Sequence, residues 1–333
     1  MNRPSSPKAD PLDPSRPAAL PRIYGDTPTF LGCPPVRLPQ GAQGCHVVFL
    51  GVPWEGTITW GTFSGCELAT KTIRHASARY GGYLPEYDVD VLERLILGDG
   101  GDVRVVPGDS ESTMAEVHAA ASGVYANGAM PVFIGGDHSY TPEVIRALAE
   151  HTDGEVGVIH LDAHLDNMPE FGGDPYPRCG PLHRVLRCPG VRKRSVVHLG
   201  IRGPRNAPLQ MALAREAGSR VMTMKEVRDR GLDKVLEEAL DRAHEGTRAV
   251  YLTICSDILD AATNPGGPPD FDGMTSHELF QVVHRVALAG LRGMDFVEVY
   301  PLQDPHHRSS HLAVWTVLHA LAGVALGSLQ SRS

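Results

Sequence analysis

Short runs of apolar residues alternate along the chain with stretches of helical periodicity. The apolar runs are typical of strands that are buried on both faces of a sheet. They are HVVFLG (46–51), PVFIGG (131–136), VGVIHLD (156–162), SVVHLG (195–200), AVYLTI (249–254) and MDFVEV (294–299). Because these runs alternate with helical segments, the pattern predicts an α/β fold with a central, mostly parallel β-sheet.

Several helix starts are predicted by capping residues. Thr113 with Glu116, and Thr275 with Glu278, fit the capping box, in which two side chains satisfy exposed N–H groups of the first helical turn. Pro142 predicts a further start, because a proline in the first turn loses no hydrogen bond. We therefore expect helices to begin near residues 113, 141 and 275.

The composition of the chain limits which domains, partners and cellular location it can be expected to have. Residues 1–22 are rich in Pro and Ser and predict a flexible tail, so that residues 23–333 form a single domain. The net charge of −8, without a run of Lys or Arg, argues against nucleic acid as a partner. We find no apolar stretch of roughly 18 residues and no signal peptide, which predicts a cytoplasmic protein without a membrane partner. The six cysteines lack paired spacing and indicate free thiols.

Polar residues with catalytic chemistry follow directly after the predicted strands. They are Gly-Gly-Asp-His-Ser (135–139), Asp-Ala-His-Leu-Asp (162–166), Cys-Ser-Asp (255–257) and Glu298. In open parallel sheets, ligands bind at the carboxyl ends of the strands, where residues distant in sequence converge. The pattern predicts one site at this edge of the sheet.

Two of these segments indicate a metal site. Asp162, His164 and Asp166 are spaced i, i+2, i+4, so in extended backbone their side chains point the same way. Carboxylates beside an imidazole suit divalent ions such as Mn²⁺, Zn²⁺ or Ni²⁺. The alternative, a solvated acidic turn, conflicts with the repulsion between two carboxylates at a buried strand end. His138 follows a Gly-Gly turn and by itself fits the start of a helix equally well.

Taken in order, five motifs resemble the arginase/agmatinase ureohydrolases. They are FIGGDHS (133–139), HLDAHLD (160–166), LGIRG (199–203), the segment 251–260 and DFVEVYP (295–301). The resemblance runs from about residue 25 to 326, and LGIRG is more similar to the agmatinase branch. It implies a three-layer αβα fold with a central parallel sheet, as in arginases and deacetylases, often assembled as a trimer or hexamer. It also implies two Mn²⁺ ions, bridged by a hydroxide that attacks a guanidinium carbon and releases urea.

The resemblance also implies a ligand set. His138 and Asp166 would hold one metal, His164 and Asp257 the other, and Asp162 would bridge both.

Two further residues acquire catalytic roles from the same resemblance. Glu298 would bind the substrate guanidinium, with a strand glutamate paired to a local arginine as the alternative. His183, in Gly-Pro-Leu-His, would pass a proton to the leaving amine, with a merely solvated loop histidine as the alternative.

One ligand position departs from the family pattern. The family motif S-x-D-x-D-x-x-D-P has Cys255 at its first aspartate, two residues before Asp257. A thiolate there would favour softer ions such as Zn²⁺ or Ni²⁺. Alternatively a single metal would remain on Asp162, His164 and Asp257, as in deacetylase-like amidohydrolases, or the site would be catalytically impaired. The simplest alternative is a small buried apolar side chain.

The loops that should surround the site also differ from the family. The segment 51–63 lacks the usual arginines, and the segment 264–274 departs from A-P-G-x-G-T-P-x-x-G-G-L. We therefore expect a small guanidino or amidino substrate other than arginine or agmatine. The predicted function is a metal-dependent amidinohydrolase, with a single-metal formimino- or acyl-amide hydrolase and a non-catalytic homologue as alternatives.

Overall fold

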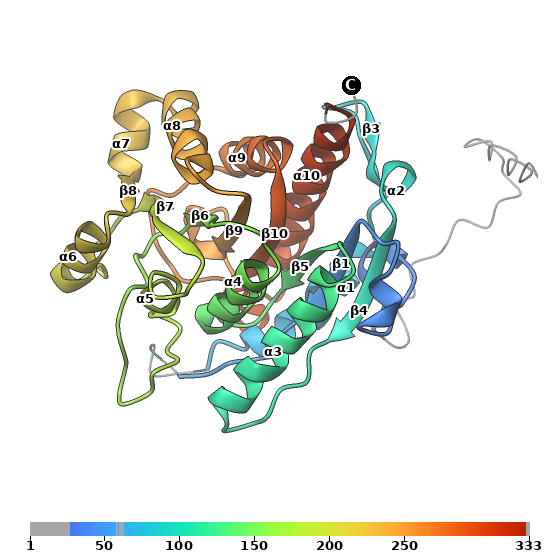
Figure 1. The fold of residues 1–333 in the computed structure, drawn as a ribbon, viewed down its shortest axis with the longest axis horizontal. Coiled ribbons are helices and arrows are strands. Elements are labelled where there is room, and N and C mark those ends of the chain that lie inside the picture. The colour runs from blue at the N-terminus through green and yellow to red at the C-terminus, as the bar shows by residue number, and fades with distance from the viewer. Residues whose placement is uncertain (1–26, 58, 60–62, 331–333) are drawn as a thin grey trace, which may run out of the picture.

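The computed structural model describes residues 27–57, 59 and 63–330, so the predicted tail at residues 1–22 lies outside the described residues. Its centre is an eight-stranded parallel sheet in the order β4-β1-β5-β10-β9-β6-β7-β8 (Figure 1). The strands are β1 (Val47–Gly51), β4 (Leu97–Asp102), β5 (Met130–Ile134), β6 (Val156–Leu161), β7 (Val191–Ile201), β8 (Arg220–Thr223), β9 (Ala249–Cys255) and β10 (Leu291–Val297). The predicted parallel sheet is confirmed.

The sequence missed both edge strands of this sheet. β4 reads LGDGGD, whose glycines and aspartates disfavour a strand, and β8 reads RVMT, which is too short for a clear pattern. A separate antiparallel ribbon joins β2 (Tyr83–Leu84) to β3 (Val89–Asp90). The six predicted apolar runs each overlap one of the inner strands.

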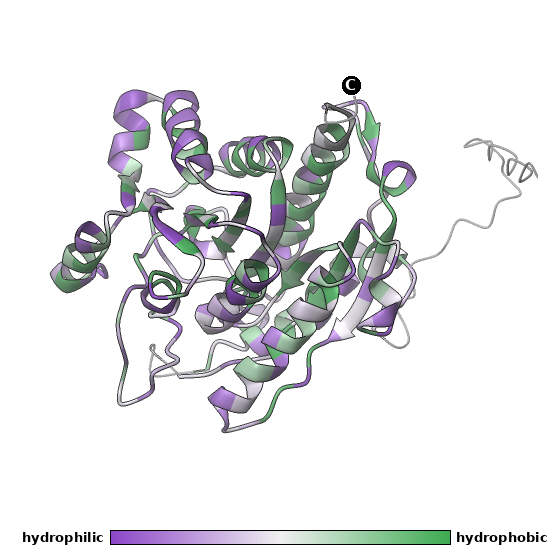
Figure 2. Ribbon diagram, in the orientation of Figure 1, coloured by the Kyte–Doolittle hydropathy of each residue, from purple (hydrophilic) through white to green (hydrophobic). Residues whose placement is uncertain are grey.

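Helices cover both faces of the sheet, which gives three layers (Figure 1). Along β1, Val47 and Phe49 face one apolar cluster, while Val48 and Leu50 face the other. The first cluster includes α1 (Ala69–Ser77), α8 (Leu232–His244), α9 (Ser276–Leu288) and α10 (Arg308–Gln330), and the second includes α3 (Ser110–Tyr125), α4 (Thr141–Glu150) and α5 (Pro181–Val185). Inner strands such as β1 and β5 are mostly hydrophobic, whereas the edge strand β4 is not, and α7 and α8 carry hydrophilic stretches (Figure 2).

Smaller elements complete the chain. They are α2 (Val91–Arg94), α6 (Pro208–Ala217), α7 (Met224–Arg230) and the short 3₁₀ turns Phe30–Gly32, Gln40–Ala42, Cys66–Leu68, His138–Tyr140, Ser256–Ile258 and Pro301–Gln303. All six cysteines are free thiols.

The predicted helix starts are partly correct. The Thr275–Glu278 capping box is present at the start of α9, and Pro142 lies in the first turn of α4. The start predicted at Thr113 is wrong, because α3 begins at Ser110 and is capped by Asp109, whose carboxylate accepts from the Ser112 N–H at 2.9 Å. Thr113 lies one turn further in, where its hydroxyl oxygen accepts from the Val106 N–H.

The expectation that the chain has no apolar stretch long enough to span a membrane is wrong for helix α10. Its segment Arg308–Gly327 is long and apolar enough by length and composition. However, 67% of its most apolar window is buried inside the protein, where α10 packs against α9 and α1. This is the environment of a core helix that is apolar on most of its surface.

Candidate metal centre and substrate cavity

Four adjacent central strands bring the predicted ligands together. β5, β10, β9 and β6 are neighbours in the sheet, and their carboxyl ends lead to His138, Glu298, Cys255 and Asp162 respectively. Because all four strands are parallel, these ends meet at one edge of the sheet. The convergence expected from the sequence is therefore present.

Unusual backbone conformations aim the side chains at this edge. Gly136 has φ +74°, and a Cβ at this position would lie 2.4 Å from the Val52 carbonyl oxygen, so only glycine fits. Glu298 and Asp166 are non-glycine residues with positive φ, at +61° and +43°. The Glu298 N–H donates to the Gly136 carbonyl at 2.9 Å, which fixes the two loops to each other. Such conformations are sparsely populated and concentrate at functional sites.

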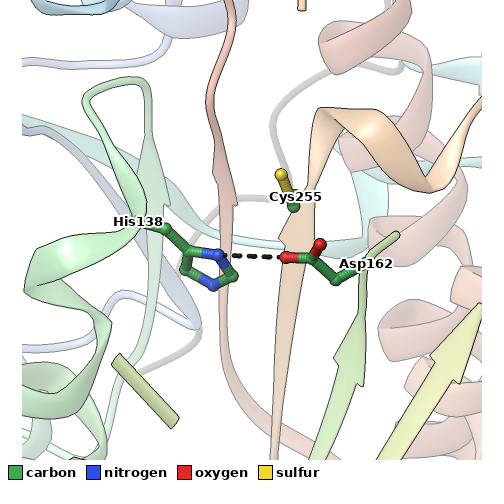
Figure 3. A group of neighbouring side chains, drawn as sticks. All are labelled: His138, Asp162 and Cys255. Carbon is green, nitrogen blue, oxygen red and sulfur yellow. Dashed lines mark ion pairs between the residues drawn. The ribbon is translucent and has the colours of Figure 1, made fainter. Parts of the chain in front are cut away.

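Two groups of candidate ligands share one aspartate. The first is His138, Asp162 and Cys255, and the second is Asp162, His164 and Asp257. Within each group the potential ligand atoms lie within 4.8 Å of one another. Figure 3 shows the first group, with the His138 ring facing the Asp162 carboxylate and Cys255 beside the two. The common Asp162 occupies the position expected of a bridging ligand.

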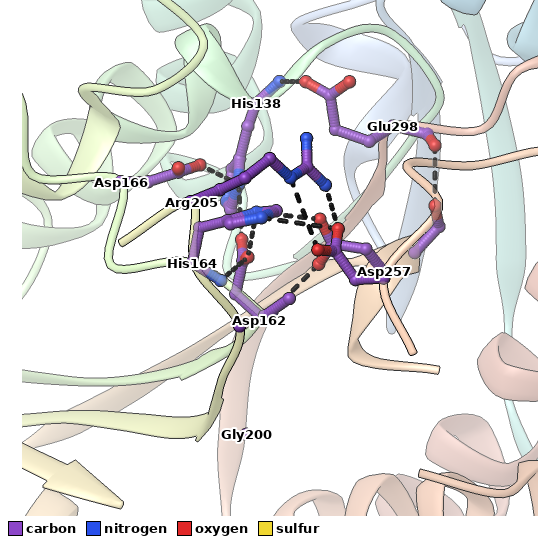
Figure 4. A network of polar contacts seen from close by, with 12 residues as sticks. His138, Asp162, His164, Asp166, Gly200, Arg205, Asp257 and Glu298 are labelled. Carbon is purple, nitrogen blue, oxygen red and sulfur yellow. Dashed lines mark hydrogen bonds and ion pairs between the residues drawn. The ribbon is translucent and has the colours of Figure 1, made fainter. Parts of the chain in front are cut away.

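The imidazole Nδ1 atoms face the carboxylates (Figure 4). His138 Nδ1 lies 3.3 Å from Asp162 Oδ2 and 3.2 Å from Asp166 Oδ2. His164 Nδ1 lies 3.3 Å from Asp162 Oδ1 and 3.0 Å from Asp257 Oδ2. All six residues predicted as ligands from the sequence thus lie in one centre, including Cys255.

Polar groups next to the centre orient the imidazole of His138. The Nε2 atom of His138 lies 2.8 Å from the Thr253 hydroxyl, which donates to Asp295 at 2.6 Å. Since the Thr253 proton goes to Asp295, the hydroxyl oxygen accepts from the Nε2–H of His138. The lone pair of the ring is thereby left on Nδ1, the atom that faces the carboxylates.

Similar contacts hold the other ligands. His164 Nε2 lies 3.3 Å from Asp270 Oδ2, which orients its Nδ1 toward Asp162 and Asp257. The bridging Asp162 is itself held by His160, whose Nε2 lies 3.0 Å from Asp162 Oδ2. Ligands in metal sites are commonly fixed by such surrounding polar groups.

The residues fit a divalent cation. His138 Nδ1 and Asp257 Oδ2 are buried and, although close to charged neighbours, have no hydrogen-bond partner. Asp162, Asp257 and Cys255 are each at most 2% exposed. Buried carboxylates without compensating positive charge are costly. The nitrogen and oxygen donors suit Mn²⁺, Zn²⁺ or Ni²⁺, and a sulfur donor favours the softer Zn²⁺ or Ni²⁺.

The pKa values of the ligand residues show that negative charge is in excess at this centre. Burial, then the charges of Asp162 and Asp257, raises the pKa of the Cys255 thiol well above its usual value. Burial and the charge of Asp162 likewise raise the pKa of Asp257. Burial opposes protonation of His138, but Asp162 and Asp166 outweigh it and raise the pKa of the imidazole. Positive charge is therefore strongly favoured at this centre, and a bound cation would supply it.

A cavity of about 240 Å³ opens onto the centre. Of the predicted site residues, its wall includes His164, Asp166, Cys255, Asp257 and Glu298. His138 and Asp162 lie behind these residues and are fully buried. A small molecule in this cavity would contact the ligand groups directly.

His183 does not line this cavity. It lies in α5, where Arg187 donates to its Nδ1 at 3.0 Å. Burial and the charge of Arg187 lower its pKa. The structure thus does not bring the predicted proton shuttle to the centre.

Glu298 has several polar partners in the cavity wall. Its Oε1 accepts from the His138 backbone N–H at 2.8 Å, and its Oε2 accepts from the Tyr300 hydroxyl at 2.7 Å and from Arg178 at 3.3 Å. Burial raises the pKa of Glu298 to about 7, against the lowering effect of Arg178. The pairing with a local arginine is therefore present, and Glu298 also lines the cavity, while its binding of a substrate guanidinium stays a prediction.

Several residues of the site were not predicted. Arg178, Arg205, Gln210 and Tyr300 line the cavity, and Asp270 pairs with Arg205 and His164. Tyr300 lies in the DFVEVYP motif, and Asp270 lies in the loop that departs from the family, so both had a sequence signal. Arg178 had none, because a loop arginine is normally solvated.

The fold and centre define a three-layer α/β protein with a buried imidazole–carboxylate centre for divalent cations. Residues 45–323 match the model of the arginase family. Guanidinopropionase of Pseudomonas aeruginosa is 33% identical over 289 residues, covering 86% of this chain and 88% of that protein. The chain belongs to the arginase family, and it is an enzyme of the ureohydrolase type, as its motifs indicated.

Solved structures agree with this assignment. Proclavaminate amidino hydrolase from Streptomyces clavuligerus superposes with a TM-score of 0.83 at 28% identity, covering 92% of this chain and 99% of that chain. A variant of formiminoglutamase from Trypanosoma cruzi, solved with Mn²⁺, has a TM-score of 0.78 at 26% identity and covers 85% and 94%. The predicted three-layer fold is confirmed.

Proposed function

We propose that this protein is a divalent-metal-dependent hydrolase that cleaves a C–N bond in the guanidino or amidino group of a small molecule. The observation that carries the proposal is the pair of ligand groups that share Asp162 beneath the cavity. The names of the relatives support it, since they include a guanidinopropionase, an amidino hydrolase and a formiminoglutamase with Mn²⁺. We propose two Mn²⁺ ions per chain, with Zn²⁺ or Ni²⁺ as alternatives because Cys255 supplies sulfur.

In such a reaction, most of these residues would bind the metal ions and Glu298 would bind the substrate. His138 and Asp166 would hold one ion, His164 and Asp257 the other, with Asp162 shared and Cys255 beside them. Divalent cations in such sites lower the pKa of water and so supply a nucleophile near neutral pH. Glu298 would accept an N–H of the substrate, because its carboxylate reaches the cavity wall.

The direct test combines metal analysis with product detection. Protein loaded with Mn²⁺, Ni²⁺, Zn²⁺ or Co²⁺ is assayed with a panel of guanidino and formimino compounds for release of urea or formamide. We expect one of these products with at least one metal, and two ions per chain by elemental analysis. Absence of both products across all four metals would refute the proposed function.

A second candidate follows from Cys255. If the sulfur does not act as a ligand, Asp162, His164 and Asp257 remain as a three-residue site for one ion. The protein would then hydrolyse a formimino or acyl amide with a single metal. One ion per chain, with formamide or a carboxylate as the product, would favour this candidate over the first.

Cellular setting and assembly also belong to the proposal. We propose a cytoplasmic homo-oligomer, a trimer or hexamer. Six free thiols suit a reducing compartment. The exposed apolar residues Tyr83, Leu92 and Ile96 in one segment suit burial against another copy. Light scattering of the purified protein measures the assembly, and a monomeric mass would contradict it.

A further inference from the structure

Arg178 is a buried cation that lies in the cavity wall next to Glu298. Only 4% of the residue is exposed. Arginine is rarely buried to this extent unless it is paired with other groups. Its Nη1 contacts Glu298 at 3.3 Å, and its Nη2 lies 3.1 Å from Glu55 and 3.6 Å from Asp137. The Arg178 guanidinium thus contacts Glu298, the same carboxylate that would bind the substrate in the proposed function.

The carboxylates around Arg178 are themselves fixed. Glu55 accepts from the backbone N–H groups of Ser64 and Gly65 at 2.7 and 2.9 Å. Asp137 accepts from the backbone N–H groups of Gly56 and Ser139 at 2.6 and 3.0 Å. Because these partners cannot turn away, they hold the arginine in place.

The backbone that carries Arg178 is also constrained. The Met168 N–H donates to the Cys179 carbonyl at 3.1 Å, and the Leu182 N–H donates to the Asp166 carbonyl at 2.9 Å. A Cβ at Gly180 would lie 2.5 Å from the Met168 carbonyl oxygen, and the Gly180 N–H donates to the Pro177 carbonyl at 3.0 Å, so Arg178 lies in a tight turn. Arg178 is therefore held in the wall of the cavity by its backbone as well as by its side-chain partners.

This arrangement limits what Glu298 can still bind. A carboxylate offers about four acceptor positions, and a planar guanidinium fork needs two of them. The His138 N–H, the Tyr300 hydroxyl and Arg178 already occupy three. One position remains, so a substrate cation can make a single hydrogen bond to Glu298, and it must do so beside the positive charge of Arg178.

We propose that Arg178 is a specificity-determining residue, which weakens the binding of cationic groups at Glu298 and makes the cavity prefer zwitterionic amidino acids to amidino compounds with net positive charge. The proposal rests on the proposed function insofar as the reacting group of the substrate lies at Glu298. A second arginine, Arg205, also lines this cavity, where it pairs with Asp270. A substrate carboxylate can accept hydrogen bonds from guanidinium groups in the wall, whereas an alkylguanidine offers no acceptor and brings a second cation next to Arg178.

The test measures binding rather than turnover. Calorimetric titrations compare 4-guanidinobutanoate, a zwitterion, with propylguanidine, a cation, on the metal-loaded protein and on Arg178→Gln. We expect the parent to bind the zwitterion at least tenfold more tightly than the cation. We expect Arg178→Gln to bind propylguanidine at least tenfold more tightly than the parent does.

A matched control removes a different buried arginine. Arg74 is also 4% exposed and is paired with Asp99 and Asp102, but it does not line the cavity. Arg74→Gln should leave both affinities within twofold of the parent. An unchanged or weaker affinity of Arg178→Gln for propylguanidine overturns the proposal.

A second variant keeps the test decisive if Arg178→Gln does not fold. The double change Arg178→Gln with Glu55→Gln removes one cation and one carboxylate together, and the same tenfold gain is expected. Urea release from the same variants is recorded separately. A gain in binding by Arg178→Gln, together with no product from the parent across the full panel of compounds and metals, would refute the proposed function and leave the role of Arg178 standing. Product from the parent without a gain in binding by the variant would overturn the role of Arg178 and leave the proposed function standing.

Discussion

Cys255 is the residue on which the chemistry of the centre depends most. It ends β9 and lies in one ligand group with His138 and Asp162. Its alternative as a purely apolar filler also has support, because the residue belongs to an apolar cluster and is 2% exposed. A thiol at this point is thus both packed and within reach of a cation.

The change Cys255→Asp tests which metal this residue favours. Replacing sulfur by a carboxylate should shift preference from softer to harder ions, since thiolates select Zn²⁺ or Ni²⁺ over Mn²⁺. We expect the Zn²⁺-to-Mn²⁺ affinity ratio to fall at least tenfold in competition experiments followed by elemental analysis. Cys188→Asp, which lies outside the cavity, serves as the control. An unchanged ratio in Cys255→Asp would show that the sulfur is not a ligand.

At the scale of helices, two capping sites show what a local pattern can and cannot predict. The Thr275–Glu278 box was predicted and is present at α9. The Thr113–Glu116 pattern has the same form, yet the chain already enters the helix at Asp109. Because Thr113 is buried against Val106, packing rather than capping determines its position.

The cap assignment of α3 can be tested by stability measurements. Asp109→Ala removes an N-cap and should lower the free energy of unfolding by about 1 kcal/mol. Glu116→Ala removes an exposed side chain whose contact with Arg104 is 3.4 Å, so its effect should stay below about 0.5 kcal/mol. Urea unfolding followed by circular dichroism compares the two. Equal effects would contradict the cap at Asp109.

Packing between α9 and α10 includes a histidine that is held neutral. His319 stacks on Phe280 with ring centroids 4.4 Å apart, and its Nδ1 accepts from the Tyr87 hydroxyl at 2.9 Å. Burial lowers the pKa of His319 to about 4. In the unfolded chain the pKa returns to about 6.5. The unfolded state therefore binds a proton more readily, and stability is lost as the pH falls from about 6.5 toward 4.

This linkage predicts a difference between the parent and His319→Gln. Glutamine keeps an acceptor for Tyr87 but does not titrate. From pH 7 to pH 5 the parent should lose about 2 kcal/mol more stability than the variant, because only the parent carries a histidine whose pKa differs between the folded and unfolded states. Unfolding curves at both pH values give the comparison. Identical pH dependence would show that His319 does not contribute.

At the scale of the whole molecule, the centre links the four innermost strands of the sheet. Asp162 follows β6, Cys255 ends β9, and His138 and Glu298 follow β5 and β10. A cation held between these strand ends should stabilise the folded state, because the unfolded chain does not assemble the ligands.

Removal of metal should therefore lower the melting temperature. At a free metal concentration of 100 times Kd, the gain is about 2.7 kcal/mol, which corresponds to several degrees. Scanning calorimetry before and after treatment with a chelator, and after Mn²⁺ is restored, measures the change. Asp257→Asn should reduce the response, while Asp229→Asn on the surface of α7 should not. If the melting temperature is the same with and without metal, the centre does not stabilise the folded state.

Much of this protein was determined by local sequence. Apolar runs flanked by glycine and aspartate predicted the inner strands, because buried parallel strands need continuous hydrophobic residues. The spacing of Asp162, His164 and Asp166 predicted a ligand edge, because alternate residues of extended backbone share one side. Short or glycine-rich edge strands such as β4 and β8 lacked that signal, since only their neighbours in the sheet define them.

Only the tertiary structure decided which charges meet in the cavity. His183 looked suitable in sequence but lies in α5 outside the cavity wall, whereas Arg178, which had no signal, is buried between Glu55, Asp137 and Glu298. Burial of an arginine depends on carboxylates more than 40 and more than 100 residues away, and no local pattern records such distances. The physical reason is that backbone preference and periodicity act over a few residues, while ion pairing acts between whatever residues the fold brings into contact.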